Sequence, residues 1–266
     1  MAHSPGMTEK RDFGDAVRPV IFQTELDDFL YATHGGSLFL VRYRERVYGL
    51  TCKHVFQDFE HGKLFVVDER QAQKGSKPAP VKTICYPSSP REGAAGTDID
   101  DVCVIEFNDD LPPEFFKGSE YVIDEQSVAT SEPGHALHVA GVLKEKTHID
   151  PPDIRIGYCR LEFRDAGSSS DPFLRHAIAQ FMNPEFASVT GISGSPVFDR
   201  TANALCGMVV RGGMNGTTCE IRYVDIFDIV RLLEAVSERS TQLDYLKNVA
   251  RPLAFGERRP AIVPRD

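Results

Sequence analysis

The stretch GISGSPVF, residues 191–198, decides how the rest of the chain is interpreted. Ser193 lies in a glycine-rich turn, between Gly191 and Gly194, and strand-forming residues follow. Serine is common in such turns for conformational reasons alone. A serine presented by a tight turn can also be a nucleophile, which needs a base, an acid that orients the base, and donors for an oxyanion. The rest of the chain must supply these partners if Ser193 is to act chemically.

The composition is that of a globular, net acidic protein. Of the 266 residues, 41% are hydrophobic, which is enough for one large domain or two packed lobes. Lys and Arg number 30 against 39 Asp and Glu, and the resulting net charge of −9 argues against nucleic acid as a partner. The amino terminus lacks the apolar segment of a secretory signal, and no apolar run reaches the roughly 18 residues of a membrane span. We expect a soluble, cytoplasmic protein with no membrane partner.

The six cysteines are scattered among Val, Ile and Leu and form no C-x-x-C pair. This pattern predicts small, reduced core residues. The sequence has no metal-binding motif and no nucleotide-binding loop, so neither a metal nor another cofactor is expected.

Short strand-like runs separated by turn residues make up most of the chain. Residues 35–56 predict two strands joined by a tight turn near Arg44 and Glu45, and residues 101–107 predict a buried strand. The acidic, irregular segment 108–135 is typical of a crossing between lobes. Further strands are expected at 137–143, 154–163, 176–181 and 204–210, with 165–172 as a connection and an amphipathic helix that begins at residue 225. Regular short strands favour barrels or a sandwich.

Two further motifs contain the side chains that a nucleophilic serine requires. LTCKHVF places His54 just after an apolar strand, and DVCVIEF places Asp101 at the start of another. The order His, Asp, Ser is that of the chymotrypsin triad. Two alternatives remain for the acid, Asp98 and Asp100, and one for the nucleophile, Ser195.

Together, the segments GSLFLV, TCKH, DVCVI and GISGSP resemble the trypsin-like, chymotrypsin-fold serine proteases, and most of all their bacterial branch. The resemblance covers residues 30–238. It implies a mainly β fold with two six-stranded antiparallel β-barrels and a C-terminal α-helix, and a serine endopeptidase that forms an acyl-enzyme. The implied division is 1–29 N-terminal extension, 30–120 first barrel, 121–224 second barrel, 225–250 helix and 251–266 flexible tail.

The resemblance also implies a role for each site residue. Ser193 would attack the peptide carbonyl, His54 would accept and return the proton, and Asp101 would fix the imidazole tautomer. The backbone N–H groups of Gly191 and Ser193 would form the oxyanion hole. A protein or peptide is therefore the expected substrate.

This sequence departs from the family pattern in several places. Cys52 and Cys103 replace two small alanines, a modest increase in volume. Ile192 stands where digestive relatives carry an aspartate that pairs with the new amino terminus, so activation by that salt bridge is excluded.

The sequence indicates less about the substrate pocket than about the triad. Ala187 stands where trypsin-type enzymes hold a basic P1 side chain with aspartate, and Gly212 is expected to line the pocket wall. An uncharged pocket predicts a small or apolar P1 residue. Glu220, on the strand that closes the pocket, would change this if its carboxylate reached inside.

Two rival functions were weighed. An α/β-hydrolase would need Gly at position 195 and a helix after the nucleophile, whereas the chain has Ser195 and a strand, turn and strand pattern. A catalytically silent trypsin-like module that binds or regulates other proteins is the second rival. An intracellular protease also requires control, for which we considered a regulatory protein partner, a narrow substrate range and the carboxyl tail.

Overall fold

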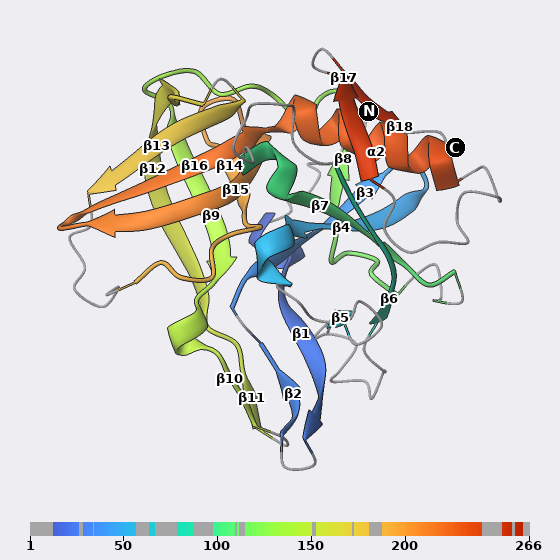
Figure 1. Ribbon diagram of the computed structural model, residues 1–266. Coiled ribbons are helices and arrows are strands. Elements are labelled where there is room, and N and C mark those ends of the chain that lie inside the picture. Colours follow the sequence, from blue (N-terminus) through green and yellow to red (C-terminus); the bar gives the residue numbers. More distant parts are fainter. Residues whose placement is uncertain are drawn as a thin grey trace, which may run out of the picture.

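The structure is a computed structural model that describes most of the chain as a series of stretches. The described residues are 13–26, 29–33, 35–56, 64–66, 79–87, 98–109, 111, 115–150, 153–171, 173–180, 188–240, 252–256 and 259–262. Two β-barrels lie side by side, and one α-helix crosses their upper side (Figure 1).

The first barrel is a ring of six antiparallel strands. β1 pairs with β3 and β5, and the ring continues from β3 through β4, β7 and β6 back to β5. The strands are β1 (Val17–Leu26), β3 (Ser37–Tyr43), β4 (Arg46–Cys52), β5 (Leu64–Val66), β6 (Ala79–Pro87) and β7 (Val102–Phe107). The turn between β3 and β4 contains Arg44 with a φ of 54°, as expected of a tight turn. Two short strands, β2 (Phe29–Ala32) and β8 (Tyr121–Ile123), add to β1 and β3.

The second barrel also closes through six antiparallel strands. They are β9 (Ala136–Val142), β12 (Tyr158–Ser168), β13 (Leu174–Gln180), β14 (Pro196–Asp199), β15 (Ala204–Asn215) and β16 (Thr218–Asp225). β12 alternates strictly between exposed and buried residues, which is the period of a strand with one face on a core. The apolar residues on its inner face therefore fill the barrel.

Helix α2 (Ile226–Ser240) contacts both barrels. Its buried face includes Ile229, Leu232 and Leu233, and it joins one apolar cluster with residues of the first barrel and with Met208 and Val210 of the second. No helix in the described part of the chain combines the length and the hydropathy that a membrane crossing needs.

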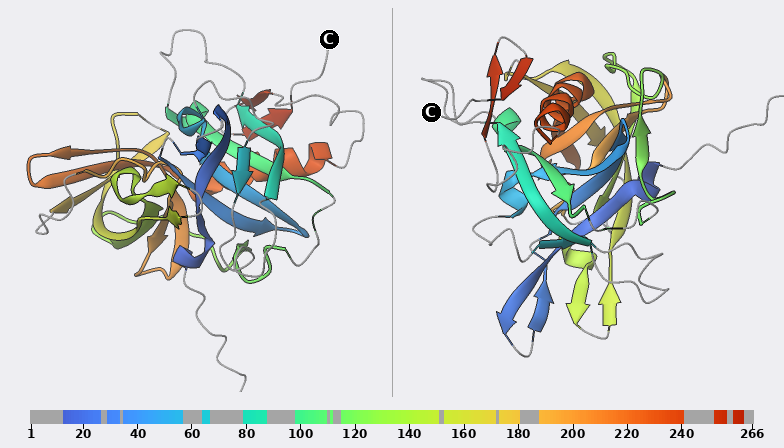
Figure 2. Two further views of the ribbon diagram at one scale, coloured as in Figure 1. Left: turned by 90° about the horizontal axis from the view of Figure 1, so that it is seen from below. Right: turned by 90° about the vertical axis from the view of Figure 1, so that its right-hand side faces the viewer.

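The remaining elements are short. They are η1 (Phe13–Ala16), η2 (Lys53–Val55), η4 (Asp98–Asp101), η5 (Lys144–Lys146), β10 (His148–Asp150), β11 (Asp153–Arg155), β17 (Pro252–Gly256) and β18 (Arg259–Ile262). The hairpins β1–β2 and β10–β11 project from the same side of the molecule (Figure 2).

The predicted fold class is confirmed: the protein is mainly β, with two six-stranded antiparallel barrels of the chymotrypsin type and a C-terminal helix. All six cysteines are buried and none forms a disulfide, in keeping with reduced core residues.

Several elements nevertheless lie outside the ranges expected for them. β1 falls in the segment 1–29 that was expected to be an extension, because Pro19 and Arg18 obscure the apolar pattern of this strand. β8 lies beyond residue 120 yet pairs with β3 of the first barrel. β17 and β18 lie in the expected tail, and β17 pairs with β6.

The connection expected at 165–172 was wrong for residues 165–168, which belong to a strand. β12 continues to Ser168, and a bulge near Gly167, which has a φ of 90°, bends the strand there. The glycine and serine content that favoured a loop thus belongs to a bulged strand end.

Candidate active site

His54 and Asp101 meet at the edge of the first barrel. β4 and β7 are antiparallel neighbours, with Cys52 opposite Val102, so residues just after β4 and just before β7 lie at the same edge. His54 lies in η2, directly after β4, and Asp101 ends η4, directly before β7. Asp101, the aspartate that directly precedes the strand, is the residue that contacts His54.

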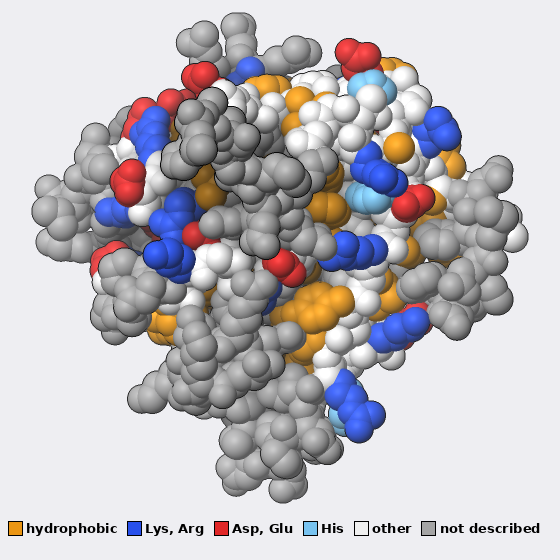
Figure 3. All heavy atoms as spheres, turned by 180° about the vertical axis from the view of Figure 1, so that it is seen from behind, with side chains coloured by type: hydrophobic (Ala, Val, Ile, Leu, Met, Phe, Trp, Pro, Cys, Tyr) orange, Lys and Arg blue, Asp and Glu red, His pale blue; other side chains and the backbone are white. Residues whose placement is uncertain are grey.

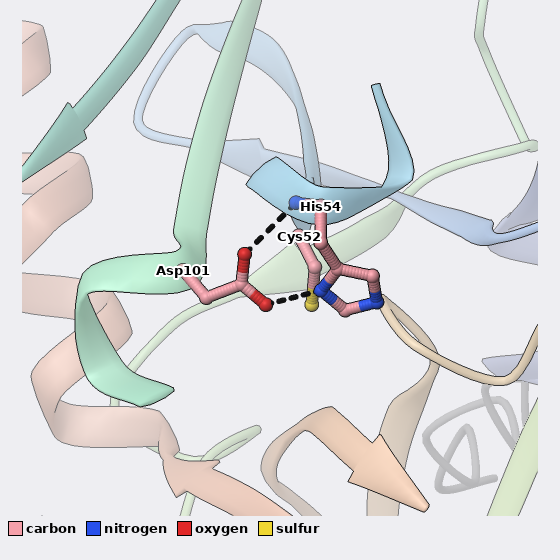
Figure 4. Close-up of side chains that lie close together, drawn as sticks. All are labelled: Cys52, His54 and Asp101. Carbon is pink, nitrogen blue, oxygen red and sulfur yellow. Dashed lines mark hydrogen bonds and ion pairs between the residues drawn. The ribbon is translucent and has the colours of Figure 1, made fainter. Parts of the chain in front are cut away.

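Two hydrogen bonds join these residues (Figure 4). His54 Nδ1 bonds Asp101 Oδ2, and the backbone N–H of His54 donates to Asp101 Oδ1 at 2.9 Å. The carboxylate therefore orients the ring while the backbone holds the carboxylate. The imidazole is 52% exposed, and its Nε2 points away from Asp101 (Figure 4). This geometry suits a base whose second nitrogen must reach a substrate.

The Ser193 turn requires its glycines because the backbone packs closely around it. Gly191 has a φ of 108° and Gly194 a φ of 87°. A Cβ atom at Gly191 would lie 2.3 Å from Val142 O, and one at Gly194 would lie 1.9 Å from Ser37 O. Any side chain at either position would displace backbone, so the glycine pattern of GISGSP has a steric cause.

Ser37, at the start of β3, connects the first barrel to this turn. Its backbone N–H donates to Ser193 O at 2.8 Å, and its hydroxyl donates to Gly191 O at 2.9 Å. The same hydroxyl accepts bonds from Val142 N at 2.8 Å and Ser195 Oγ at 3.0 Å. Ser37 is fully buried, so these bonds are shielded from water. Sequence reasoning missed this residue, although it lies in the quoted GSLFLV segment.

Ser195 does not compete for the role of nucleophile. It is fully buried, and its hydroxyl donates to Ser37. Ser193 is partly exposed.

The Ser193 turn also contacts the strand that leads to His54. Gly194 N donates to Val209 O at 2.8 Å, and Cys52 Sγ approaches the same carbonyl at 3.4 Å. Ser193 Oγ itself donates to Val210 O at 3.5 Å. Within the described part of the chain, no hydrogen bond joins Ser193 to His54. Catalytic hydrogen bonds are often loose or misaligned in ligand-free sites.

Two backbone donors are available beside Ser193. Among the described residues, no acceptor faces the N–H of Gly191 or of Ser193, whereas the intervening Ile192 N donates to Val189 O at 3.3 Å. The two N–H groups expected to bind an oxyanion are thus not used by the surrounding protein.

Gly212 packs against apolar side chains in the direction of its missing Cβ atom, and it also lines a cavity together with Arg211 and Glu220. A Cβ atom on Gly212 would lie 2.9 Å from Ile192 Cδ1 and 3.3 Å from Ile221 Cγ2, and both isoleucines are buried. Glu220 points to the other face of β16, where its carboxylate lies 3.6 Å from His176 Nε2. Ala187 lies outside the described residues.

A second histidine–aspartate pair, which the sequence did not predict, lies where β9 begins and β14 ends. His135 Nδ1 bonds Asp199 Oδ2 at 2.7 Å, and Asp199 is fully buried. Its other carboxylate oxygen accepts bonds from Thr201 N at 2.8 Å and Ala202 N at 3.0 Å. The two residues are 64 positions apart in the sequence, and no motif links them.

Comparison with known proteins supports the fold and goes no further. No protein-family model matches the chain, and no curated protein matches it. Among solved structures it is similar to human heparin binding protein, with a TM-score of 0.53 and 13% identity over 92% of this chain and 97% of that one. A mutant of human heparin binding protein aligns with a TM-score of 0.54 and 11% identity over 87% of this chain and 94% of that one. Such low identity shows a shared trypsin-like fold alone.

Proposed function

We propose that this protein is a serine endopeptidase of the trypsin-like type, most similar to the bacterial branch, that acts through His54, Asp101 and Ser193. The observation that carries the proposal is the His54–Asp101 pair beside a serine on a turn with positive φ angles. Two barrels contribute to one site, and Ser37 holds the Ser193 turn against the first of them.

In the proposed mechanism, the Asp101 carboxylate accepts a hydrogen bond from Nδ1–H of His54. The lone pair of His54 Nε2 is then free to accept a proton. Substrate binding would turn the Ser193 hydroxyl from Val210 O toward His54. Ser193 Oγ would then attack the peptide carbonyl while its proton moves to Nε2. The protonated imidazole would give that proton to the leaving amine, and water would hydrolyse the acyl-enzyme by the same steps in reverse.

The backbone N–H groups of Gly191 and Ser193 would stabilise the negative oxygen of each tetrahedral intermediate. Loss of one such donor typically costs about 2.7 to 4 kcal/mol of barrier. Because Ile192 replaces the aspartate of digestive relatives, the apolar contacts of Ile192 would hold this turn in place of a salt bridge.

For the substrate we infer a small P1 side chain, such as Gly or Ala. Ile192 and Ile221 occupy the space beside Gly212 and leave a shallow apolar wall. Glu220 lines the same cavity as Gly212, but its carboxylate lies 3.6 Å from His176 Nε2, and this contact would compete with a basic P1 side chain. Mass-spectrometric mapping of cleavage sites in a peptide library should return mostly small P1 residues, and a majority of Arg or Lys would contradict the inference.

Six buried cysteines without a disulfide are typical of a reducing compartment and support a cytoplasmic location. Fractionation of the producing cells tests this location. An intracellular protease of this kind would need restraint. We propose that a regulatory protein partner, a narrow substrate range or residues 251–266 restrain the activity. Deletion of residues 251–266 should raise the activity only if these residues are the restraint.

A catalytically silent module is the second candidate, and the absent bond between Ser193 and His54 favours it. Heparin binding itself is not carried over from the similar structures. The net charge is −9. On the back of the molecule, basic side chains are interspersed with histidine, acidic and uncharged ones (Figure 3).

The two candidates are separated by reaction with a fluorophosphonate, which labels activated serines. Intact mass should show one adduct on the wild type and none on Ser193→Ala or His54→Ala. Ser127→Ala and His138→Ala alter an exposed turn and an exposed ion pair, and they are the matched controls that should keep the adduct. A folded wild type that acquires no adduct, or an adduct that persists in Ser193→Ala, would overturn the protease proposal.

A further inference from the structure

A thiol lies beside the His54–Asp101 pair. Cys52 Sγ, a nitrogen of His54 and a carboxylate oxygen of Asp101 all lie within 4.8 Å of one another. Figure 4 shows the sulfur near Nδ1, the ring nitrogen that faces Asp101. These residues form no zinc motif in the sequence, since Asp101 is 47 residues from His54.

We propose that Cys52, His54 and Asp101 form a regulatory site for a thiophilic divalent cation, with Zn²⁺ as the best match. Thiolate, imidazole and carboxylate are the three ligand types that zinc binds in proteins, whereas Mg²⁺ and Ca²⁺ prefer oxygen alone. Zinc bonds of about 2.0 Å to nitrogen and oxygen and about 2.3 Å to sulfur place tetrahedral ligands roughly 3.3 to 3.6 Å apart. In the protein the three ligand atoms lie within 4.8 Å of one another, so binding would require Asp101 Oδ2 to separate from His54 Nδ1 while Cys52 Sγ stays close to both.

The local contacts allow each ligand to be recruited. The backbone N–H of His54 anchors Asp101 Oδ1, so Oδ2 can turn from the imidazole to a metal without releasing the carboxylate. Cys52 Sγ has a hydrogen bond to Val209 O at 3.4 Å, and that carbonyl already accepts a bond from Gly194 N. Because the imidazole is 52% exposed, a cation can approach from the ring side even though Cys52 is buried. A water molecule would supply the fourth ligand.

Binding would change the protonation state of the base. The Cys52 thiol would lose its proton to solvent, and a metal on His54 Nδ1 would move the remaining imidazole proton to Nε2. Nε2 would then be a donor and could not accept the proton of Ser193. This inhibitory consequence rests on the proposed protease function, whereas the binding site itself does not.

Cobalt(II) tests the site without any assay of activity, because a cobalt–thiolate bond gives a near-ultraviolet charge-transfer band. Titration of the wild type with Co²⁺ should produce this band at one equivalent, and Zn²⁺ should abolish it. Cys52→Ala and Cys52→Ser should lose the band and weaken Zn²⁺ binding by about 100-fold. Cys103→Ala is the matched control, since Cys103 is buried next to Asp101 but outside the cluster, and it should keep the band. No band on the wild type, or an unchanged band in both Cys52 variants, would overturn the proposal.

Fluorophosphonate labelling with and without Zn²⁺ tests the consequence. Zn²⁺ should slow labelling of the wild type and of Cys103→Ala, a chelator should restore it, and labelling of Cys52→Ala should respond to Zn²⁺ only at about 100-fold higher concentration. Equal inhibition of all three variants would contradict a role for Cys52. A Cys52-dependent cobalt band on a protein that is never labelled would support the metal site and refute the protease. Labelling without any band would do the reverse.

Discussion

Two histidine–aspartate pairs in this protein differ in what surrounds them. In both, the imidazole Nδ1 bonds an aspartate oxygen and backbone N–H groups hold the other oxygen. Asp101 is 22% exposed and Asp199 is fully buried. His54 Nε2 points away from Asp101, whereas His135 Nε2 lies 3.7 Å from a second carboxylate, that of Glu132.

The electrostatic surroundings of the second pair favour the charged forms of both residues. Burial raises the pKa of Asp199, but hydrogen bonds from Ala202 N–H, His135 and other donors outweigh it and leave the pKa below its usual value. The hydrogen bond to Asp199 raises the pKa of His135, and burial only partly opposes this. A histidine–aspartate pair is therefore no sign of catalysis by itself. A base also needs a free ring nitrogen and a nearby nucleophile, and only the first pair has Ser193 on the adjoining turn.

Removal of the carboxylate from the first pair should have the largest effect, and it should lower the reaction rate of Ser193 rather than the stability of the fold. Asp101→Ala is expected to lower the rate of fluorophosphonate labelling by about 10⁴-fold, because the imidazole loses the acceptor that fixes its tautomer. The melting temperature should change little, since a partly exposed pair contributes about 1 kcal/mol or less. Labelling kinetics and thermal unfolding of the same preparation measure both. An unchanged labelling rate would show that Asp101 does not serve the triad.

The same change in the second pair should act on stability. Asp199→Ala would remove a buried carboxylate and leave His135 and the backbone N–H groups of Thr201 and Ala202 without their acceptor, which is expected to cost roughly 3 kcal/mol. Denaturant unfolding measures this loss. At a temperature where the variant stays folded, its labelling rate should remain within about threefold of the wild type. A large loss of labelling in the folded variant would break the distinction between the two pairs.

The smallest expected effect is the pH dependence of the second pair. Because the pKa of His135 is raised on folding above its ordinary 6.5, the ion pair with Asp199 stabilises the protein fully below that value. The contribution is lost as the pH rises through the raised value. The difference in melting temperature between wild type and His135→Gln should therefore be largest near pH 6, about 2 °C or less, and shrink toward pH 9.

His138→Gln is the matched control for this experiment, because His138 contacts the exposed carboxylate of Glu162. Its difference from the wild type should vary less with pH. A His135→Gln difference that grew from pH 6 to pH 9 would reverse the assigned sign.

Much of the fold was predictable because strand period and turn chemistry are local properties. The tight turn at Arg44 and the strands around it follow from residues adjacent in the sequence. β1 was missed because a proline and a buried arginine interrupt its apolar pattern, and only its pairing with β3 and β5 closes the barrel. Pairing partners far apart in the chain leave no such local signal.

By itself, the sequence determined the motifs that contain His54, Asp101 and Ser193, the glycines of the Ser193 turn and the mainly β class, since each depends on a few neighbouring residues. Only the tertiary structure decided that Ser37 binds the Ser193 turn, that Cys52 lies against the His54–Asp101 pair, and that Ile192 and Ile221 fill the space beside Gly212. The second histidine–aspartate pair belongs with these. These contacts depend on strand pairing and close packing rather than on local preference: Ser37 meets the Ser193 turn between the two barrels, and the other contacts form within one barrel.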